Sequence, residues 1–357
     1  MKTDMFNYPL PEDLVARHPA EKRTHSRLLV VNRALRSISH DHFYNIGKYL
    51  RTGDLLVLND TRVIPARLPG FRVPGGGKVE ILLTRKKEPL LWEAMVRPGK
   101  KIRPGDRIVF KPKLLEAEIV QYLEPGYRLI RFFCKHPFEQ VLQKLGHTPL
   151  PPYILKARRD DLNTDLAHIP WEQPQDRDRY QTVYAKQNGS IAAPTAGLHF
   201  SNELISALKS RGVQITFITL HVGPGTFKPV TEENIEDHVM HSETYTVLPQ
   251  AAKLINRAKR EKRRVIPVGT TVVRTLESCM DENGVLKSGT AETSLMILPG
   301  RRFGYADALV TNFHLPRSTL LMLVCAFGGK DLIFKAYKEA VEKKYRFYSY
   351  GDAMLIL

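Results

Sequence analysis

The feature that most restricts the fold is a change of texture between residues 68 and 146. Here the chain consists of short β-rich runs separated by proline and glycine turns such as Pro74–Gly77. Short strands at nearly regular spacing are typical of a small β-barrel. We therefore predict an inserted β-barrel domain over residues 68–150, closed by a helix over Pro137–Leu145. Its predicted strands are Val79–Thr84, Leu91–Val96, Arg107–Phe110, Leu115–Tyr122 and Tyr127–Phe133.

On both sides of this insertion, strand-like and helix-like segments alternate, which predicts an α/β fold. The 357 residues are enough for two domains. We expect residues 1–67 and 151–357 to form one discontinuous α/β domain with a mostly parallel sheet. Within it, we expect residues 156–179 to be a loop, Thr231 to begin a helix, and Thr293–Leu298 to form a strand.

The most informative part of the α/β domain is the stretch Ile191–Phe227. Ser201 is typical of a helix N-cap, and Gly212 ends the helical pattern that follows it. Val213–Val222 is rich in β-branched residues and predicts a buried strand. If Ser190–Ala193 is also a strand, the unit is a right-handed crossover between two parallel strands.

Polar clusters follow the predicted strands, and parallel strands bring such clusters to one edge of the sheet. Ligands bind at this carboxyl edge in open α/β sheets. A single histidine near a strand end is more often structural, but five clusters on one edge predict a site. The clusters are Asn59 with Asp60 and Thr61, Thr195 with His199, His221 with Thr226, Thr270 with Thr271, and His314.

Several kinds of chemistry lack their usual signatures. The chain has neither a Walker loop nor a Gly-x-Gly-x-x-Gly turn, and no Gly-x-Ser-x-Gly elbow. The pair His238 and His241 has no third metal ligand at the usual spacing, and neither has the pair His40 and His42. We therefore expect no metal site.

The net charge of +17 favours a polyanionic partner, usually a nucleic acid. A helix over Gln250–Lys262 and its tail carry a basic run that is either a phosphate-contacting surface or a solvated face. Three scattered cysteines, no signal peptide and no long apolar run predict a cytoplasmic protein without a membrane segment. The basic residues predicted to bind RNA are Lys259, Arg260, Arg263 and Arg264.

Seven motifs in these same regions resemble those of the S-adenosylmethionine:tRNA ribosyltransferase-isomerases of queuosine biosynthesis. The resemblance runs from about Tyr8 to the C-terminus. Two departures, Pro224 and the length of residues 157–178, concern loop geometry. The motifs are Gly53–Arg67, Ala192–Phe200, Leu220–Phe227, Glu236–Glu243, Val268–Glu277, Val310–Pro316 and Tyr345–Met354.

The resemblance implies a two-domain fold and an unusual reaction in which S-adenosylmethionine is a substrate. Its ribosyl moiety moves to the aminomethyl group of 7-aminomethyl-7-deazaguanine at the wobble position of tRNA with a GUN anticodon. The product is epoxyqueuosine, and adenine and methionine are released. We expect a monomer that needs no metal.

The reaction requires a base and an acid, and histidine suits both roles near neutral pH. His199 and His221 are our first candidates, followed by His314 and His241. Arg274 has two interpretations, as the ligand of the methionine carboxylate or as the ion-pair partner of Glu277 on the same helix. The residues predicted to bind S-adenosylmethionine are Asn59, Asp60, Thr195, Thr226, Glu243, Thr270, Thr271, Arg274, Asn312 and Asp352.

Two other functions remain open from the sequence. A non-catalytic RNA-binding module accounts for the charge but not for the strand-end clusters. An enzyme that acts on a free nucleoside accounts for the clusters but not for the charge.

Overall fold

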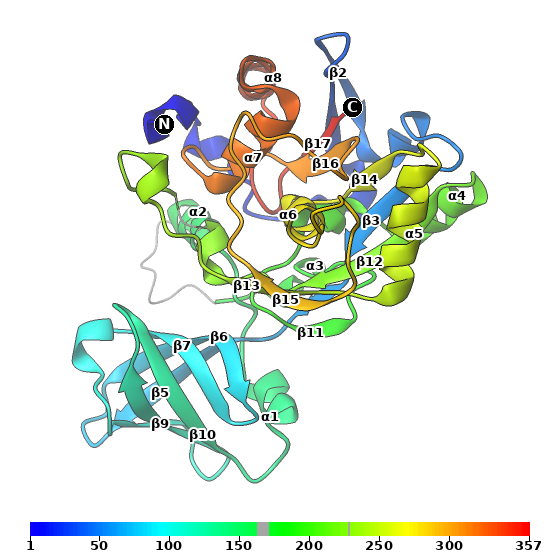
Figure 1. Ribbon diagram of the computed structural model, residues 1–357. Helices are drawn as coiled ribbons and strands as arrows, with labels where there is room; N and C mark the ends of the chain where they lie inside the picture. The colour runs from blue at the N-terminus through cyan, green and yellow to red at the C-terminus, as the bar shows by residue number, and fades with distance from the viewer. Residues whose placement is uncertain (163–170, 228) are drawn as a thin grey trace.

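The computed structural model describes the backbone of residues 1–162, 171–227 and 229–357, and their side chains except those of residues 161, 162, 226 and 227. It confirms the predicted architecture, an α/β fold interrupted by an inserted β-barrel. Figure 1 shows the barrel below the sheets and helices of the α/β part.

The sheet that organises the α/β part has the order β14-β3-β12-β13-β15. β14, β3 and β12 are parallel to one another, whereas β13 runs antiparallel to both of its neighbours, β12 and β15. The sheet is thus parallel at its centre and mixed overall. The bounds are Val265–Pro267 for β14, Leu55–Asn59 for β3, Gln214–Leu220 for β12, Glu243–Val247 for β13 and Gly289–Thr293 for β15.

A second sheet, of order β16-β17-β1-β2, continues the first. A parallel bridge between Val268 and Val310 joins the two, so β16 lies next to β14 with the same direction. β17 is antiparallel to β16 and parallel to β1. The bounds are Leu309–Asn312 for β16, Ala353–Ile356 for β17, Arg27–Asn32 for β1 and Ser37–His42 for β2.

Helices cover these sheets and enclose the core. α4 begins after Ser201, whose Oγ accepts a hydrogen bond from Leu204 N at 3.2 Å, as its N-cap position predicts. α7 is almost entirely buried, because its apolar side chains face neighbours on every side. The bounds are Asn202–Ser210 for α4, Pro249–Arg260 for α5, Thr270–Ser278 for α6, Thr319–Gly328 for α7 and Lys330–Glu342 for α8.

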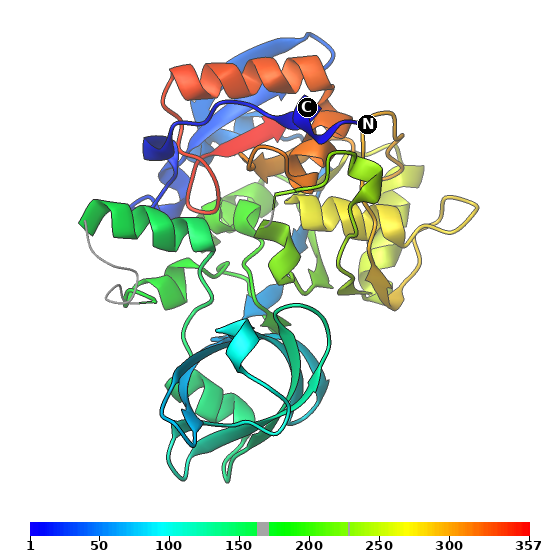
Figure 2. The same cartoon turned by 90° about the vertical axis from the view of Figure 1, so that its left-hand side faces the viewer.

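Six antiparallel strands close the barrel in the order β10-β7-β6-β5-β8-β9. Figure 2 shows the ring of strands from one end. Alternate side chains fill its interior, and α1 (Phe138–Leu145) packs Phe138 against Trp92 and Phe132. The bounds are Arg67–Val73 for β5, Lys78–Glu88 for β6, Leu91–Arg97 for β7, Arg107–Lys111 for β8, Leu115–Tyr122 for β9 and Tyr127–Phe133 for β10.

The chain enters and leaves the barrel through adjacent segments. Arg67 and His147 exchange two backbone hydrogen bonds, of 3.1 and 2.8 Å. A Cβ atom on Gly146 would stand 2.0 Å from the carbonyl oxygen of Pro65, so this close approach requires glycine. The two connections therefore form one compact neck.

The expected crossover from Ser190–Ala193 is wrong in its first strand. β11 (Gln187–Ser190) ends where that strand was expected to begin, and it pairs in parallel with β4 (Thr61–Val63). The residues after it turn into a short 3-10 helix, Thr195–His199. β12 instead finds its parallel partner in β3.

Three local expectations are also corrected. Residues 152–162 form α2 (Pro152–Leu162), and Asp176–Arg179 form α3, so only part of 156–179 is a loop; residues 163–170 lie outside the described residues. Thr231 begins no helix, because the N-terminal segment takes the backbone groups that follow it, with Thr3 N donating to Glu233 O at 3.0 Å. Thr293 ends β15 rather than beginning a strand, because its Oγ1 accepts from Leu295 N at 3.1 Å and turns the chain.

Candidate active site

One edge of the combined sheets gathers most of the predicted residues. β3, β12, β14 and β16 share a direction and end at Asn59, Leu220, Pro267 and Asn312. β13, β17 and β1 begin at the same edge, so Glu243, Asp352 and Ser26 lie there as well. Three separate cavities at this edge are lined by some of these residues, among them Glu243, Asn312 and Ser26.

A cavity of about 740 Å³ lies between the α/β part and the barrel. Its volume falls in the range of small-molecule sites, roughly 300–1,000 Å³. The α/β wall includes His221, Gly223, His241 and Glu243. The barrel wall includes Lys86, Trp92, Glu93, Glu124 and Tyr127.

Two histidines, His221 and His241, line this cavity, and His221 is held by the fold. Its Nδ1 forms a 2.8 Å hydrogen bond with Thr61 Oγ1, and burial lowers its pKa, so the ring is largely neutral at neutral pH. Gly189 has a φ of +147°, and a Cβ there would stand 2.8 Å from the imidazole Cε1. Glycine at position 189 thus leaves room beside the Cε1–Nε2 edge of a largely neutral imidazole.

Beside His221, Glu243 and Arg274 form an ion pair in which each side chain is 5% exposed. Glu243 Oε1 also accepts a 2.8 Å hydrogen bond from Gly223 N. Arg274 Nε donates to Leu295 O at 3.0 Å. Glu277, the ion-pair partner in one of the two interpretations of Arg274, instead accepts hydrogen bonds from the backbone nitrogens of Gly304 and Tyr305.

A smaller cavity, of about 50 Å³, lies farther along the edge. It brings together Thr195, Thr270, Thr271, Asn312 and His314. Among the described residues, Thr271 Oγ1 and Asn312 Oδ1 are buried without a hydrogen-bond partner. Two unpaired buried oxygens favour a ligand that donates hydrogen bonds.

His314 lies in the wall of this smaller cavity but is tied to the protein. Its Nε2 forms a 2.8 Å hydrogen bond with Thr311 Oγ1, and its backbone oxygen accepts from the Tyr8 hydroxyl at 2.6 Å. Burial lowers the pKa of His314 to about 3. It is therefore neutral near neutral pH.

His199 belongs to a third and still smaller cavity of about 20 Å³. Its Nε2 lies 3.2 Å from Asn312 Nδ2, and its Nδ1 lies 2.7 Å from Ser26 Oγ. The amide of Asn312 is a donor, so Nε2 accepts and Nδ1 carries the proton. Burial lowers the pKa of His199 to about 4, against the opposing charge of Asp352.

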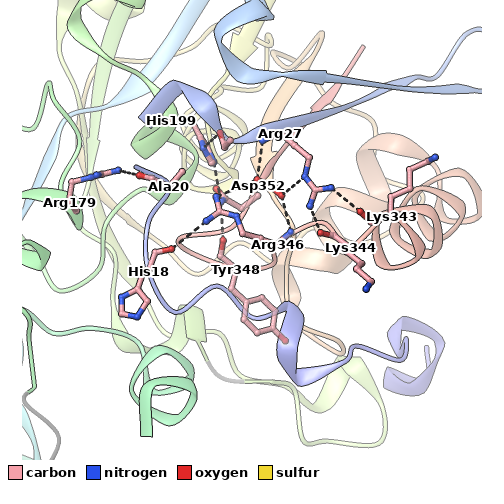
Figure 3. A network of polar contacts seen from close by, with 12 residues as sticks. His18, Ala20, Arg27, Arg179, His199, Lys343, Lys344, Arg346, Tyr348 and Asp352 are labelled. Carbon is pink, nitrogen blue, oxygen red and sulfur yellow. Dashed lines mark hydrogen bonds and ion pairs between the residues drawn. The ribbon is translucent and has the colours of Figure 1, made fainter. Parts of the chain in front are cut away.

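Figure 3 shows the network next to His199. Asp352 is 1% exposed and accepts hydrogen bonds from the backbone nitrogens of Arg27 and Arg346, at 3.0 and 2.8 Å. Both guanidinium groups also pair with its carboxylate. Asp352 thus ties β1 to the C-terminal loop, and it lines none of the three cavities.

Two further residues that were predicted to bind S-adenosylmethionine form hydrogen bonds with other residues of the protein. Asn59 joins β3 to β12, donating to Leu220 O at 2.9 Å and accepting from Leu220 N at 3.0 Å. Asp60 accepts a 2.6 Å hydrogen bond from Thr219, and burial raises its pKa. The side chain of Thr226 lies outside the described residues.

The four basic residues of α5 and its tail lie at the opposite edge of the sheet. Leu55 N, at the start of β3, donates to Arg264 O, and Arg263 donates to Gly53 O at 2.7 Å. Lys259 pairs with Asp307 at 3.1 Å, and Arg264 pairs with Asp54. These contacts place Lys259, Arg263 and Arg264 at the edge opposite to the one that the three cavities line.

Several lining residues had no sequence signal. Ser26 precedes a strand rather than following one, so the strand-end rule does not find it. Trp92 and Tyr127 lie within barrel strands, where alternation indicates only a buried face. Thr61 was part of a polar cluster, although its bond to His221 depends on the tertiary fold.

None of the described helices is both long and apolar enough for a membrane span. The described side chains include no group of three or more His, Cys, Asp or Glu residues placed to hold a metal ion.

Comparisons with known proteins cover almost the whole chain. The model of a family described as "Queuosine biosynthesis protein" matches residues 3–356. Curated proteins named S-adenosylmethionine:tRNA ribosyltransferase-isomerase are 53% identical in Carboxydothermus hydrogenoformans and 51% identical in Caldanaerobacter subterraneus, with complete coverage of both chains in each case. A crystal structure of S-adenosylmethionine tRNA ribosyltransferase from Thermotoga maritima is 36% identical, with a TM-score of 0.54, and the match covers 99% of this chain and 100% of that one.

Proposed function

Because the chain belongs to the queuosine biosynthesis protein family, we propose that it is an S-adenosylmethionine-dependent tRNA ribosyltransferase-isomerase. It transfers and isomerises the ribosyl moiety of S-adenosylmethionine onto 7-aminomethyl-7-deazaguanine at the tRNA wobble position. The products are epoxyqueuosine-tRNA, adenine and methionine. The observation that carries this proposal is the interdomain cavity, which is large enough for a nucleobase and holds a neutral histidine beside a carboxylate.

His221 is the proposed base of this reaction. The sulfonium of S-adenosylmethionine acidifies the C5′ proton of the ribose, and a neutral imidazole with a free Nε2 edge is able to remove it. Glu243 lines the same cavity and is the proposed carboxylate that faces the positive charge of the substrate. Asp352 is less suited to this role, because it is enclosed in its own network of ion pairs. His241 is the second histidine of this cavity and the proposed acid for the departing adenine.

The smaller cavity supports a separate role in holding the polar groups of S-adenosylmethionine. Thr195, Thr270 and Thr271 present hydroxyls there, and Asn312 presents an unpaired carbonyl oxygen. Ribose hydroxyls and the methionine ammonium are donors of the kind that this oxygen accepts. His199 orients the amide of Asn312 and is thereby a proposed positioning residue.

The remaining features of the proposal concern the whole molecule. The partner is tRNA with a GUN anticodon, the protein acts as a monomer in the cytoplasm, and the net charge of +17 supports the affinity for RNA. We also propose that residues 68–150 form one domain and that residues 1–67 and 151–357 form the other.

Adenine release from S-adenosylmethionine tests the proposal directly. Release is expected with tRNA that carries the precursor base, and an anticodon stem-loop is expected to compete. Release with the free nucleoside at the same rate would favour an enzyme of nucleoside metabolism instead. Binding of the precursor tRNA without any adenine release would identify a non-catalytic RNA-binding module.

A further inference from the structure

The barrel wall of the interdomain cavity carries two polar groups that the proposed function does not use. Tyr127 is 8% exposed and Trp92 is 6% exposed, and both line the cavity. In the part of the chain that the structure describes, neither the Tyr127 hydroxyl nor Trp92 Nε1 has a hydrogen-bond partner. Buried donors of this kind are nearly always paired, and leaving one unpaired costs about 1–3 kcal/mol. Two on one wall indicate a ligand that accepts hydrogen bonds.

The opposite wall suits a flat ligand. The ring of His241 lies 6.3 Å from the ring of Tyr127, centroid to centroid, with 34° between the planes. His221 and Glu243 complete this side. RNA bases that are recognised individually are unstacked, stack on aromatic or histidine rings, and are hydrogen-bonded at their edges. The rings of Tyr127 and His241 contact each other at this separation, so a base stacks against the pair rather than between the two rings. The two walls together therefore match a single nucleobase.

The charged side chains beside Tyr127 indicate which kind of base the cavity favours. Burial, together with the negative charges of Glu124 and Glu93, raises the pKa of Tyr127 to about 12, so its hydroxyl remains a donor. Glu93 is paired with Lys87 at 2.6 Å. Glu124 lines the cavity, and its carboxylate has no ion-pair partner among the described residues. A carboxylate at this position favours a base with a cationic substituent.

We propose that the barrel forms the nucleobase-binding wall of the active site. Tyr127 and Trp92 donate hydrogen bonds to acceptor atoms on the edge of the base, and Glu124 attracts its cationic aminomethyl group. The barrel is then a specificity element that distinguishes the precursor base from guanine. This inference rests on the proposed function, because it takes the substrate from it.

The test compares two anticodon stem-loops that differ only in carrying guanine or the aminomethyl base. Tyr127→Phe and Trp92→Phe are expected to weaken binding of the aminomethyl stem-loop roughly threefold to tenfold each, the value of one hydrogen bond. Glu124→Gln is expected to reduce the preference for the aminomethyl base over guanine. Tyr122→Phe is the matched control, since Tyr122 is 46% exposed on the barrel and its hydroxyl donates to Ile102 O.

The result that overturns the inference is wild-type binding and wild-type base preference in Tyr127→Phe and Glu124→Gln. Tyr127→Phe removes only one oxygen, so it decides the matter even if Trp92→Phe fails to fold. Failure of the proposed function is a different result, in which the wild-type protein binds the precursor stem-loop but releases no adenine. The binding comparison still reports on the barrel wall in that case.

Discussion

His221 and His199 occupy the same edge of the sheets but two different environments. His221 lines a cavity of about 740 Å³ and has one hydrogen bond from its ring, to Thr61. His199 lines a cavity of about 20 Å³, is 4% exposed, and has both ring nitrogens engaged by Ser26 and Asn312. A substrate atom can reach the first ring, whereas the second is enclosed by the protein. Burial, rather than residue type, therefore separates the proposed base, His221, from the proposed positioning residue, His199.

The largest expected effect comes from the accessible histidine. His221→Gln should lower the rate of adenine release with saturating substrates by roughly 10²–10⁴-fold, the usual contribution of a general base. The matched variant His199→Gln should lower it by at most about tenfold, because it alters the orientation of Asn312 by one hydrogen bond. Single-turnover measurements check both, and equal losses would remove the distinction between the two histidines.

The next largest effect is expected from the ion pair in the wall beside His221, and it concerns stability. Glu243→Gln leaves the buried charge of Arg274 unpaired and should lower the free energy of unfolding by about 3–5 kcal/mol. Glu261→Gln, which breaks an exposed pair with Arg257, should cost less than about 1 kcal/mol. Denaturant unfolding measures both changes. Similar values for the two would mean that the Glu243–Arg274 pair is not buried as described.

The two enclosed histidines predict a stability change with pH. Burial lowers the pKa of His199 to about 4 and that of His314 to about 3, below the value of about 6.5 for an unfolded histidine. Between these values the unfolded chain binds more protons, so stability falls as the pH falls. Each residue should contribute on the order of 2 kcal/mol of this loss between pH 6.5 and 5.

Unfolding curves at pH 7 and pH 5 measure this loss. The variant His314→Gln should show a smaller difference between the two curves than the wild-type protein. An identical difference in the variant would show that His314 is not buried as a neutral ring.

The smallest effect is expected at the opposite edge of the sheet. Reversing Lys259, Arg260, Arg263 and Arg264 to Glu was expected from the sequence to weaken tRNA binding and flatten its salt dependence. Three of the four already contact carboxylates or carbonyl groups far from the cavities. We therefore expect only a small change in the salt slope of tRNA binding. A large change would extend the RNA contact surface to this edge.

The sequence predicted the positions of the strands better than the partners with which strands and side chains pair. Alternation and turns located five barrel strands, but β5 was missed, because Pro69 and Gly70 conceal its pattern until it pairs with β6 and β8. The shared edge followed from parallel pairing in β3, β12 and β14. Closeness in the sequence did not predict the ion-pair partner of Arg274. This partner is Glu243, which is 31 residues away, rather than a residue one turn along the same helix.

Roles within the site were hardest to predict, because they depend on which side chains meet across the fold. His199 and His221 look alike along the chain, and only the packing of Ser26 and Thr61 distinguishes them. The role of the barrel wall depends on how the two parts of the molecule face each other, and no local sequence pattern predicts this arrangement.

The neck between the two parts has a consequence for folding. A flexible insertion of about 80 residues would burden the α/β part with roughly 4 kcal/mol of loop-closure entropy beyond a constant term. The backbone pairing of Arg67 with His147 holds the two ends of the barrel together. Once the barrel has closed, the two ends of the insertion lie as close together as the ends of a tight turn. A barrel that folds early on the ribosome would thus shorten the effective separation between β3 and β12, which must pair across it.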